Sequence, residues 1–321
     1  MRSTALTGVV SALLLSAGME LSAQTGYPSR AVSLIVPFSP GTGIDILART
    51  LGERLSVRWG HPVVIENKPG ASGNIGAEAA MKAVPDGHAL LVTATSFATN
   101  AALAKRLPYD PLQSFAPVSL LATGTLSLVV PATSPARSVG EFIELSRVKP
   151  LHYASTGNGT VQHLTMELLK QALGIELVHV PYKANAGAIT DVAGGHVDAM
   201  ITPLHTAGPL AKQNRLRMLA VLSGERTPLF PSVPTLGEAG FADLEVVVWY
   251  AMLAPSGTPH LLIGRLNGDI DAVLSAVEVK EALGKQGLAP IGGSPGRLAK
   301  LLQAELARWP RVVTKAGIKA D

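Results

Sequence analysis

The residues with the clearest chemical potential form a glycine-rich turn between an apolar run and a helical pattern. Residues 31–36 predict a short buried strand, and 37–43, with two prolines and two glycines, end it. A helical period begins at Ile44. Glycine permits the tight turn, and the first N–H groups of a helix have no acceptor within that helix. The pattern therefore indicates a place where a small anion can bind.

The same arrangement occurs three more times along the chain. Each further turn follows a predicted strand and precedes a predicted helix: 67–76, 95–96 and 155–160. A single glycine-rich turn is ordinary punctuation between elements. Four of them at the carboxyl ends of strands predict helix N-termini that converge on one anion site.

Other kinds of chemistry find little support in the chain. It has no cysteine, which excludes thiolate metal sites and cysteine nucleophiles. No Gly-x-Ser-x-Gly elbow or Gly-Lys-Ser/Thr loop is present, and residues 157–162 lack the third glycine of a dinucleotide fingerprint. The eight histidines include no His-x-x-x-His pair. We expect no metal and no cofactor, and no nucleophile–base pair is visible that would indicate an enzyme.

Several polar and aromatic residues have two interpretations each. His163, in the first turn of the helix after 155–160, either contacts a ligand or lies on the helix surface. Asp45 either favours the helix macrodipole or accepts a hydrogen bond from a ligand amine, amide or hydroxyl. Asp198 is either a turn residue or a group that faces a cleft. For Trp249 and Tyr250 we favour packing in the core and hinge over stacking on a ligand.

The elements that position these residues alternate between strand and helix. Strands are predicted at 31–36, 63–66, 89–94, 116–131, 152–154, 176–180, 198–201, 216–222 and 244–253, and helices at 44–57, 74–84, 97–104, 138–146, 160–173, 186–193, 259–274, 278–286 and 295–308. This order is typical of an α/β protein with two doubly wound lobes. The apolar passages near 118–130 and 244–254 predict a two-strand hinge, with the ligand cleft between the lobes.

Composition and the N-terminus bound the class of protein. At 321 residues the chain fits two lobes with sizeable cores, and 47% hydrophobic with 16% charged residues excludes a disordered tail. The formal charge of +4 is spread along the chain, so we expect no nucleic-acid partner. Residues 1–23 resemble a cleavable signal peptide more than a membrane anchor, because the apolar stretch is short. The chain is therefore expected to be exported, and the resemblance given below implies the periplasm as its location.

Longer motifs in collinear order resemble one family. The chain is similar to the Bordetella uptake gene (Bug) proteins, the solute receptors of tripartite tricarboxylate transporters, at Val36-Pro37-Phe38-x-Pro40-Gly41-x-Gly43-x-Asp45, Glu66-Asn67-Lys68-Pro69-Gly70-Ala71-x-Gly73-Asn74-Ile75-Gly76, Tyr153-Ala154-Ser155-x-Gly157-x-Gly159-Thr160-x-x-His163, Gly194-Gly195-x-Val197-Asp198 and Trp249-Tyr250-x-x-Leu253-Ala254-Pro255. The resemblance spans essentially all of the mature chain.

The resemblance implies a type II periplasmic-binding-protein-like fold that closes on a small, usually carboxylated, solute. It implies lobe 1 at 24–124 and 245–321 and lobe 2 at 125–244. In the family a ligand carboxylate is held by backbone amides and bridging waters. Transferred to this chain, the implied ligand-binding residues are Phe38, Ser39, Gly43, Asp45, Ala71, Ser72, Gly73, Ser96, Ser155, Thr156, Gly157, Thr160, His163 and Asp198.

The resemblance also implies partners. A receptor of this kind acts as a monomer and delivers its solute to membrane permease subunits of a tripartite tricarboxylate transporter. A periplasmic sensor with the same binding chemistry and a signalling partner is the alternative. None of the four turns contains arginine, so we expect N–H groups and hydroxyls, rather than Lys68 or Arg49, to hold the anion.

Overall fold

The first part of the sheet is built from the strands that carry the first three glycine-rich turns. A computed structural model describes residues 26–104, 106–183, 185–241, 244–315 and 317–318, so the predicted signal peptide lies outside the described residues. Strands β2 (Val63–Asn67), β1 (Val32–Val36) and β3 (Ala89–Ala94) are parallel neighbours. The apolar run of β1 is almost wholly buried, as expected for a parallel strand covered on both faces.

Two long strands complete this part of the sheet and lead out of it. Strand β9 (Val247–Pro255) runs antiparallel to both β3 and β4 (Phe115–Pro131). The short β10 (Leu288–Pro290), which the sequence did not predict, pairs with β4. Strand β4 has 17 residues because it pairs with strands in two different parts of the sheet.

The pairing of β4 changes near its middle. Residues 115–125 pair with β9, and residues 126–131 pair with β7 (Ala199–Pro203) and β8 (Leu216–Val221). Strands β5 (Leu151–Ser155) and β6 (Leu177–Pro181) continue in the order β4-β7-β5-β6, with β5 parallel to both neighbours. We call the two parts of the sheet, with their helices, the first and the second lobe. Their residue boundaries stay a prediction.

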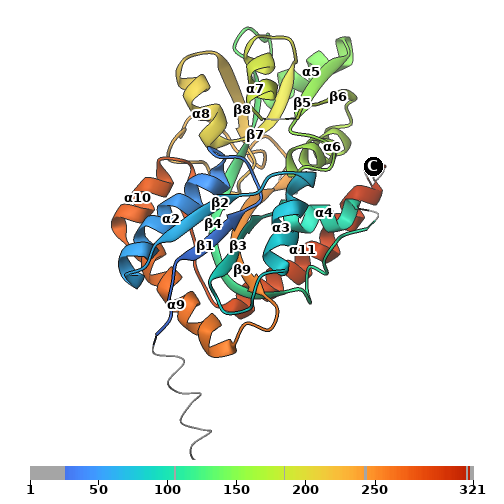
Figure 1. Cartoon of the computed structure of the whole chain (residues 1–321). Helices are drawn as coiled ribbons and strands as arrows, with labels where there is room; N and C mark the ends of the chain where they lie inside the picture. Colours follow the sequence, from blue (N-terminus) through green and yellow to red (C-terminus); the bar gives the residue numbers. More distant parts are fainter. Residues whose placement is uncertain (1–25, 105, 184, 242–243, 316, 319–321) are drawn as a thin grey trace, which may run out of the picture.

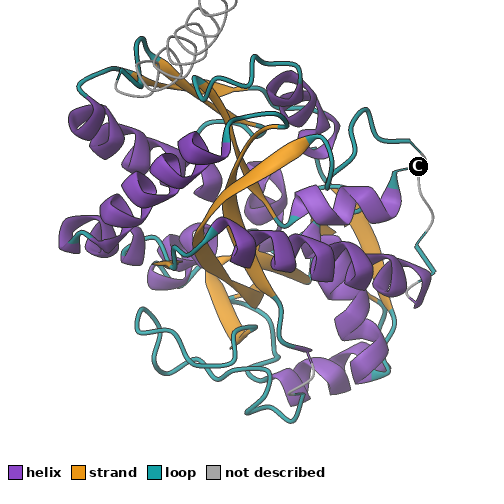
Figure 2. Cartoon of the chain, turned by 90° about the horizontal axis from the view of Figure 1, so that it is seen from below, coloured by secondary structure: helices purple, strands orange, loops and turns teal. Residues whose placement is uncertain are grey.

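Helices cover both faces of the first-lobe sheet. Helices α2 (Gly43–Trp59), α9 (His260–Ser275) and α10 (Val277–Gly284) pack together on one face, and α3 (Asn74–Met81), α4 (Ser96–Leu103) and α11 (Pro295–Lys315) cover the other (Figure 1). Helix α2 buries one stripe, Ile44, Leu47, Leu51 and Leu55, at helical spacing. Viewed from below, strands run through the middle of the molecule with helices on either side (Figure 2).

Four helices lie in the described part of the second lobe. They are α5 (Val139–Val148), α6 (Val161–Leu173), α7 (Asn185–Ala193) and α8 (Leu204–Lys212). Helices α7 and α8 share a separate apolar cluster with β7 and β8. The sequence did not predict α8, because Gly208 and Pro209 interrupt its pattern, and Pro209 lies inside the helix.

The C-terminal helix returns to the first lobe, as predicted. Helix α11 packs on α4 and β4 and extends beyond the predicted end at residue 308. Its last residue, Lys315, accepts a hydrogen bond through its carbonyl from Gln171 of α6, at 2.7 Å. None of the helices in the described ranges is long and apolar enough to span a bilayer.

Candidate functional site

Four loops follow strand ends and are the candidate site: the first loop (37–42), the second (68–73), the third (95–96) and the fourth (155–160). The first loop turns through Gly41, whose φ of 81° is left-handed. Helix α2 then begins at Gly43. Its N-cap, Thr42, makes no capping bond, and its hydroxyl donates instead to the Ser39 carbonyl at 2.8 Å. No side chain therefore covers the N-terminus of α2 as a cap.

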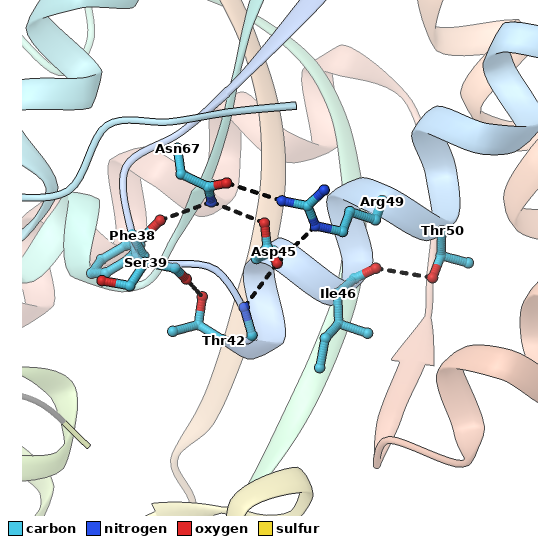
Figure 3. A network of polar contacts seen from close by, with 9 residues as sticks. Phe38, Ser39, Thr42, Asp45, Ile46, Arg49, Thr50 and Asn67 are labelled. Carbon is cyan, nitrogen blue, oxygen red and sulfur yellow. Dashed lines mark hydrogen bonds and ion pairs between the residues drawn. The ribbon is translucent and has the colours of Figure 1, made fainter. Parts of the chain in front are cut away.

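The first loop is held from behind by a polar network around Asp45 (Figure 3). Asp45 Oδ2 accepts from the Gly41 N–H at 2.9 Å and from Arg49 Nε at 3.0 Å, while Oδ1 accepts from Asn67 Nδ2 at 2.9 Å. The same Asn67 amide donates to the Phe38 carbonyl, and Arg49 Nη2 donates to Asn67 Oδ1. The first loop, α2 and β2 are thereby joined at one carboxylate.

Asp45 is ionised although it is only 2% exposed. Burial acts to raise its pKa, but hydrogen bonds from Arg49, Gly41 and Asn67 outweigh burial, and the pKa lies below its usual value. Both carboxylate oxygens are engaged within the protein. Of the two interpretations of Asp45, the one in which it positions the first loop has direct geometric support, and a contact with the ligand stays a prediction.

The second loop has an unusual backbone. Ala71 and Ser72 have φ values of 46° and 54°, and Gly70 and Gly73 are also at positive φ. A non-glycine residue in this region is strained and is typical of functional loops. The Ser72 carbonyl accepts from Asn100 Nδ2 of α4 at 2.8 Å, which fixes the loop against the next helix.

The third loop is tied to the returning strand. Thr95, 1% exposed, accepts from the Trp249 N–H through its hydroxyl at 3.0 Å, and its own N–H donates to the Trp249 carbonyl. Ser96 follows as the half-buried first residue of α4. Trp249 itself donates its indole N–H to Glu305 of α11, so it packs in the core.

The fourth loop is organised by Ser155, which is fully buried. Its hydroxyl lies 3.1 Å from the Gly157 carbonyl and accepts from the Gly157 N–H at the same distance. It also lies 2.6 Å from His179 Nε2 on β6. Thr156 follows, half-buried, and its hydroxyl has no hydrogen bond to any described residue.

His163 is neither exposed on a helix surface nor paired with a metal ligand. It is 6% exposed, and its Nδ1 accepts from the Gly159 N–H at 3.0 Å. Its ring stacks on His179 with centroids 3.9 Å apart, and His179 stacks on Tyr153 at 4.8 Å. Thr160 caps α6 by accepting from the His163 N–H and donates to the Gly157 carbonyl. These residues build the fourth loop.

The pair of Ser155 and His179 is one that the sequence did not reveal, because the two residues lie on different strands. Burial, reinforced by the neighbouring His163, lowers the pKa of His179 to about 4, so its ring is neutral near pH 7. No carboxylate of a described residue holds its second ring nitrogen, and Ser155 has no exposed surface. The geometry is that of a loop anchor rather than an exposed nucleophile. In the described ranges no group of three or more His, Asp or Glu could hold a metal.

Asp198 lies apart from the four loops. It precedes β7, where its carboxylate accepts from the His152 N–H at 2.9 Å and lies 3.2 Å from Lys149 Nζ. His152 is at the start of β5, whereas Ser155 ends that strand. The structure therefore does not bring Asp198 together with the other predicted residues, and its ligand role stays a prediction.

The loops contact one another within the first lobe. The Phe38 ring lies 3.3 Å from the point that a Cβ on Gly73 would occupy, so the first and second loops touch. Gly76 lies in the first turn of α3. A Cβ on it would lie 2.7 Å from Pro37, so no side chain would fit there. The second loop in turn bonds α4 through Ser72.

The two lobes also contact each other beside the loops. Leu103, at the end of α4, contacts Gly159 of the fourth loop. His205, near the start of α8, lies against Gly43 at the start of α2: a Cβ on Gly43 would lie 2.5 Å from Cε1 of His205. The second contact also involves Tyr250 of β9, whose hydroxyl is 3.1 Å from the same point.

His205 and Tyr250 were not among the predicted site residues. His205 belongs to a helix that the sequence pattern did not reveal, and Tyr250 was interpreted as hinge packing. The available signal for His205 was its position just after the carboxyl end of a predicted strand. The same rule identified the four loops.

The cations nearest the first two loops are paired. Lys68 Nζ lies 3.1 Å from Glu66 Oε2, and both side chains are about 40% exposed. Arg49 is engaged with Asp45 and Asn67. Their partners are consistent with the expectation that neither cation holds the anion.

Comparison with protein families gives one match over most of the chain. The sequence model of one protein family, described as "Tripartite tricarboxylate transporter family receptor", matches residues 47–318. A protein of Pseudomonas sp. (strain P51), "UPF0065 protein in tcbD-tcbE intergenic region", is 36% identical over 323 residues, covering 100% of this chain and 96% of that protein. BugT of Bordetella pertussis is 34% identical and covers 99% of each chain.

Solved structures give the same result. Rpa4515 of R. palustris with adipate is 36% identical, with a TM-score of 0.86 over 91% of this chain and 99% of that one. MatC of Rhodopseudomonas palustris with bound malate is 31% identical, with a TM-score of 0.81 over 89% and 100%. The periplasmic binding protein BugD is 31% identical, with a TM-score of 0.83 over 91% and 99%. The predicted periplasmic-binding-protein fold is confirmed.

Proposed function

Because this chain belongs to the tripartite tricarboxylate transporter receptor family, we propose that it captures a small carboxylated anion between its two lobes for a membrane permease. Solved members of the family are periplasmic solute-binding proteins, so a solute-binding role is the premise. The class of solute, its place in the molecule and its delivery are the proposal.

One observation carries the placement. The contacts of Gly43 with His205 and of Leu103 with Gly159 join the first lobe to the second at two separate points, one at the start of α2 and one at the fourth loop. A solute bound among these loops touches both lobes at once. Binding proteins of this architecture hold ligands at the carboxyl ends of their strands, where all four loops lie.

The chemistry of the loops suits a carboxylate. The N-terminus of α2 carries partial positive charge, and no side chain caps it. Hydroxyls of Ser96 and Thr156, half-buried in neighbouring loops, are further donors. Neutral donors, partly through water, bind a carboxylate without specifying its substituent. Adipate in Rpa4515 and malate in MatC are ligands of this class.

Both lobes are needed for useful affinity. A hydrogen bond to a charged group contributes about 1.5–3 kcal/mol, while association costs at least about 4 kcal/mol. Micromolar binding, about −8 kcal/mol, therefore needs contacts from each lobe. We expect calorimetry with adipate and malate to give a dissociation constant in or below the micromolar range for the better of the two, and small-angle scattering to show compaction. An unchanged radius of gyration at saturation would contradict closure.

Delivery to a permease and export to the periplasm are proposed on family grounds. A signalling receptor is the second candidate, since it would use the same binding chemistry. A permease gene beside the receptor gene, and loss of solute uptake on its deletion, would support transport. Uptake that survives deletion of the receptor, together with a lost transcriptional response, would support sensing.

Catalysis is not part of the proposal. The one serine–histidine pair described above is buried and anchors a loop. We expect adipate and malate to be recovered unchanged after prolonged incubation with the protein, as measured by mass spectrometry. Turnover of either acid that is lost in Ser155→Ala would contradict a purely binding role.

A further inference from the structure

Tyr250 is a largely buried tyrosine whose hydroxyl has no hydrogen-bond partner among the described residues. The residue is 4% exposed on β9. Its ring is accommodated by two glycines: the hydroxyl is 3.1 Å from the Cβ point of Gly43, and Cε2 is 3.3 Å from that of Gly124. The hydroxyl forms no hydrogen bond with any described residue. Among the described residues, the buried side-chain atoms without a partner belong to Thr165, Asn185 and Thr202, so the Tyr250 hydroxyl keeps solvent-accessible surface and is open to a group that binds at the start of α2.

His205 reaches the same point from the other lobe. Its Nδ1 is 3.1 Å from the Cβ point of Gly43, and its ring makes no hydrogen bond with a described residue. Burial lowers the pKa of His205 to about 4, so the ring is neutral near pH 7. Burial also keeps Tyr250 protonated by raising the pKa of its hydroxyl. Two neutral side chains thus flank the uncapped N-terminus of a 17-residue helix.

The two carboxylates nearest in sequence to the first two loops, Asp45 and Glu66, already have partners within the protein. The four loops contain no Asp or Glu. Both carboxylate oxygens of Asp45 accept hydrogen bonds, from Gly41, Arg49 and Asn67. The Glu66 carboxylate accepts a hydrogen bond from Ser33 and forms an ion pair with Lys68. An ammonium group bound here would meet the positive end of α2 without a counter-charge, which is costly in a desolvated site. Tyr250 and His205 could accept its hydrogen bonds but could not compensate its charge.

We propose that Tyr250 and His205 bind one carboxylate of the solute at the N-terminus of α2, and that the solute carries no ammonium group. The inference rests on the proposed function and narrows its class of solute to dicarboxylates and hydroxy acids, as opposed to amino acids. Tyr250 donates from the returning strand, and His205 donates from the second lobe. The carboxylate then bridges the two lobes at the point where they already approach.

Matched pairs of acids test the class of solute on the unaltered protein. Calorimetry compares succinate with aspartate, glutarate with glutamate, and adipate with 2-aminoadipate. Each pair differs only in the amino group. We expect the best-bound diacid to bind at least about tenfold more tightly than its amino counterpart. The reason is that burying an uncompensated ammonium charge costs more free energy than one added hydrogen bond returns. Equal or tighter binding of the amino acid would overturn the inference.

Variants test the two side chains. Tyr250→Phe removes one hydroxyl and should weaken the best diacid about tenfold, and His205→Phe should weaken it by a similar or smaller factor. Tyr27→Phe is the control, because that hydroxyl donates to the Gly87 carbonyl away from the loops. His205→Gln, which keeps a donor, should recover part of the loss and serves if His205→Phe does not fold.

The outcomes separate the two levels of the proposal. If the diacids bind but neither Tyr250→Phe nor His205→Phe changes affinity while melting temperatures match wild type, the inference fails and the proposed function stands. If no acid of the three pairs binds the wild-type protein, the proposed function fails first and the inference falls with it. Loss in both variants, with Tyr27→Phe unaffected, supports both.

Discussion

The first and fourth loops solve the same geometric problem with opposite chemistry. Both join a parallel strand to a helix at the site. The first is held by the buried carboxylate of Asp45 with its partners Arg49 and Asn67, and the N-terminus of α2 is left without a side-chain cap. The fourth is held by a neutral stack of aromatic rings, and Thr160 caps α6. An anion therefore finds a more open helix end on the first lobe than on the second.

The two loops also differ in which of their residues hold the loop in place. The first loop has no charged side chain of its own, and the Asp45 carboxylate of α2 positions its Gly41 N–H group. In the fourth loop Ser155, Thr160 and His163 make hydrogen bonds within the loop, whereas the Thr156 hydroxyl has no partner among the described residues. The two loops should therefore respond differently when their supports are removed.

The largest effect should come from Asp45→Ala. The change leaves the Gly41 N–H and the Asn67 amide without their acceptor, at about 1–3 kcal/mol for each group that stays buried. We expect a lower melting temperature and at least about a tenfold loss of affinity for the best diacid, since a misplaced helix N-terminus binds an anion poorly. Calorimetry and thermal unfolding measure both effects.

Hydroxy acids decide whether Asp45 also contacts the ligand. If the residue only positions the first loop, affinity for malate and for succinate should fall by the same factor. A loss confined to malate, with an unchanged melting temperature, would show that Asp45 accepts a hydrogen bond from the ligand hydroxyl.

The pH dependence of stability should separate the charged loop from the neutral one. Between pH 6.5 and 4 the unfolded chain binds a proton at His179 that the folded protein does not, because its folded pKa is about 4. In this range the free energy of unfolding should therefore decrease as the pH is lowered, by about 1.4 kcal/mol per pH unit for each such histidine. His205 has the same direction of shift and contributes likewise.

His179→Phe keeps an aromatic ring in the stack and removes its proton. Urea denaturation at pH 7 and pH 5 should show a smaller pH-dependent loss in this variant than in wild type. Asp45 acts in a lower window: its pKa is below the usual 3.8, so its contribution is present above that pH and is lost only as pH falls further. An unchanged pH dependence in His179→Phe would show that the ring titrates normally in the folded protein.

A smaller effect should distinguish two threonines of the fourth loop. Thr160→Val removes the cap of α6 and should cost about 1 kcal/mol of stability. Thr156→Val should leave stability nearly unchanged and weaken binding of the best diacid about threefold to tenfold, as expected for loss of one ligand hydrogen bond. The reverse pattern, with Thr156 structural and Thr160 specific for the ligand, would contradict the assignment of roles.

The smallest effect should come from Lys68→Ala. Lys68 and Glu66 form an exposed pair, which contributes about 0–1 kcal/mol, so affinity should stay within about threefold of wild type. From sequence alone the same is expected of Arg49→Ala. Since Arg49 supports Asp45, we now expect Arg49→Ala to cost more than Lys68→Ala. A hundredfold loss in Lys68→Ala would show that the anion lies beside the second loop.

The elements with strong local signals could be predicted from sequence. Strand β3 was predicted residue for residue, and α2 to within two residues, because apolar periodicity and flanking glycines mark both. Helix α8 was missed because Pro209 weighs against a helix, although the neighbouring strands and the apolar cluster stabilise it. Tertiary packing overrides local preference there.

The site was predictable as a set of loops but not as a set of roles. Strand ends locate the loops, since parallel strands place their carboxyl ends together. Whether Asp45 faces the ligand or Arg49, or whether His163 stacks on His179, depends on residues 4 to 22 positions away in the chain. No local pattern encodes such pairings. The lack of a partner for the Tyr250 hydroxyl among the described residues likewise depends on the folded structure and not on local sequence.

The continuity of β4 limits how the two lobes can move. Residues 115–131 form one strand that pairs with β9 on one side of residues 125–126 and with β7 and β8 on the other. No loop interrupts β4 at this point. A rotation of one lobe relative to the other would therefore twist the strand itself. Gly124 lies at that point, beneath the Tyr250 ring. Elastic strain from opening would therefore concentrate beside the hydroxyl proposed to hold the solute.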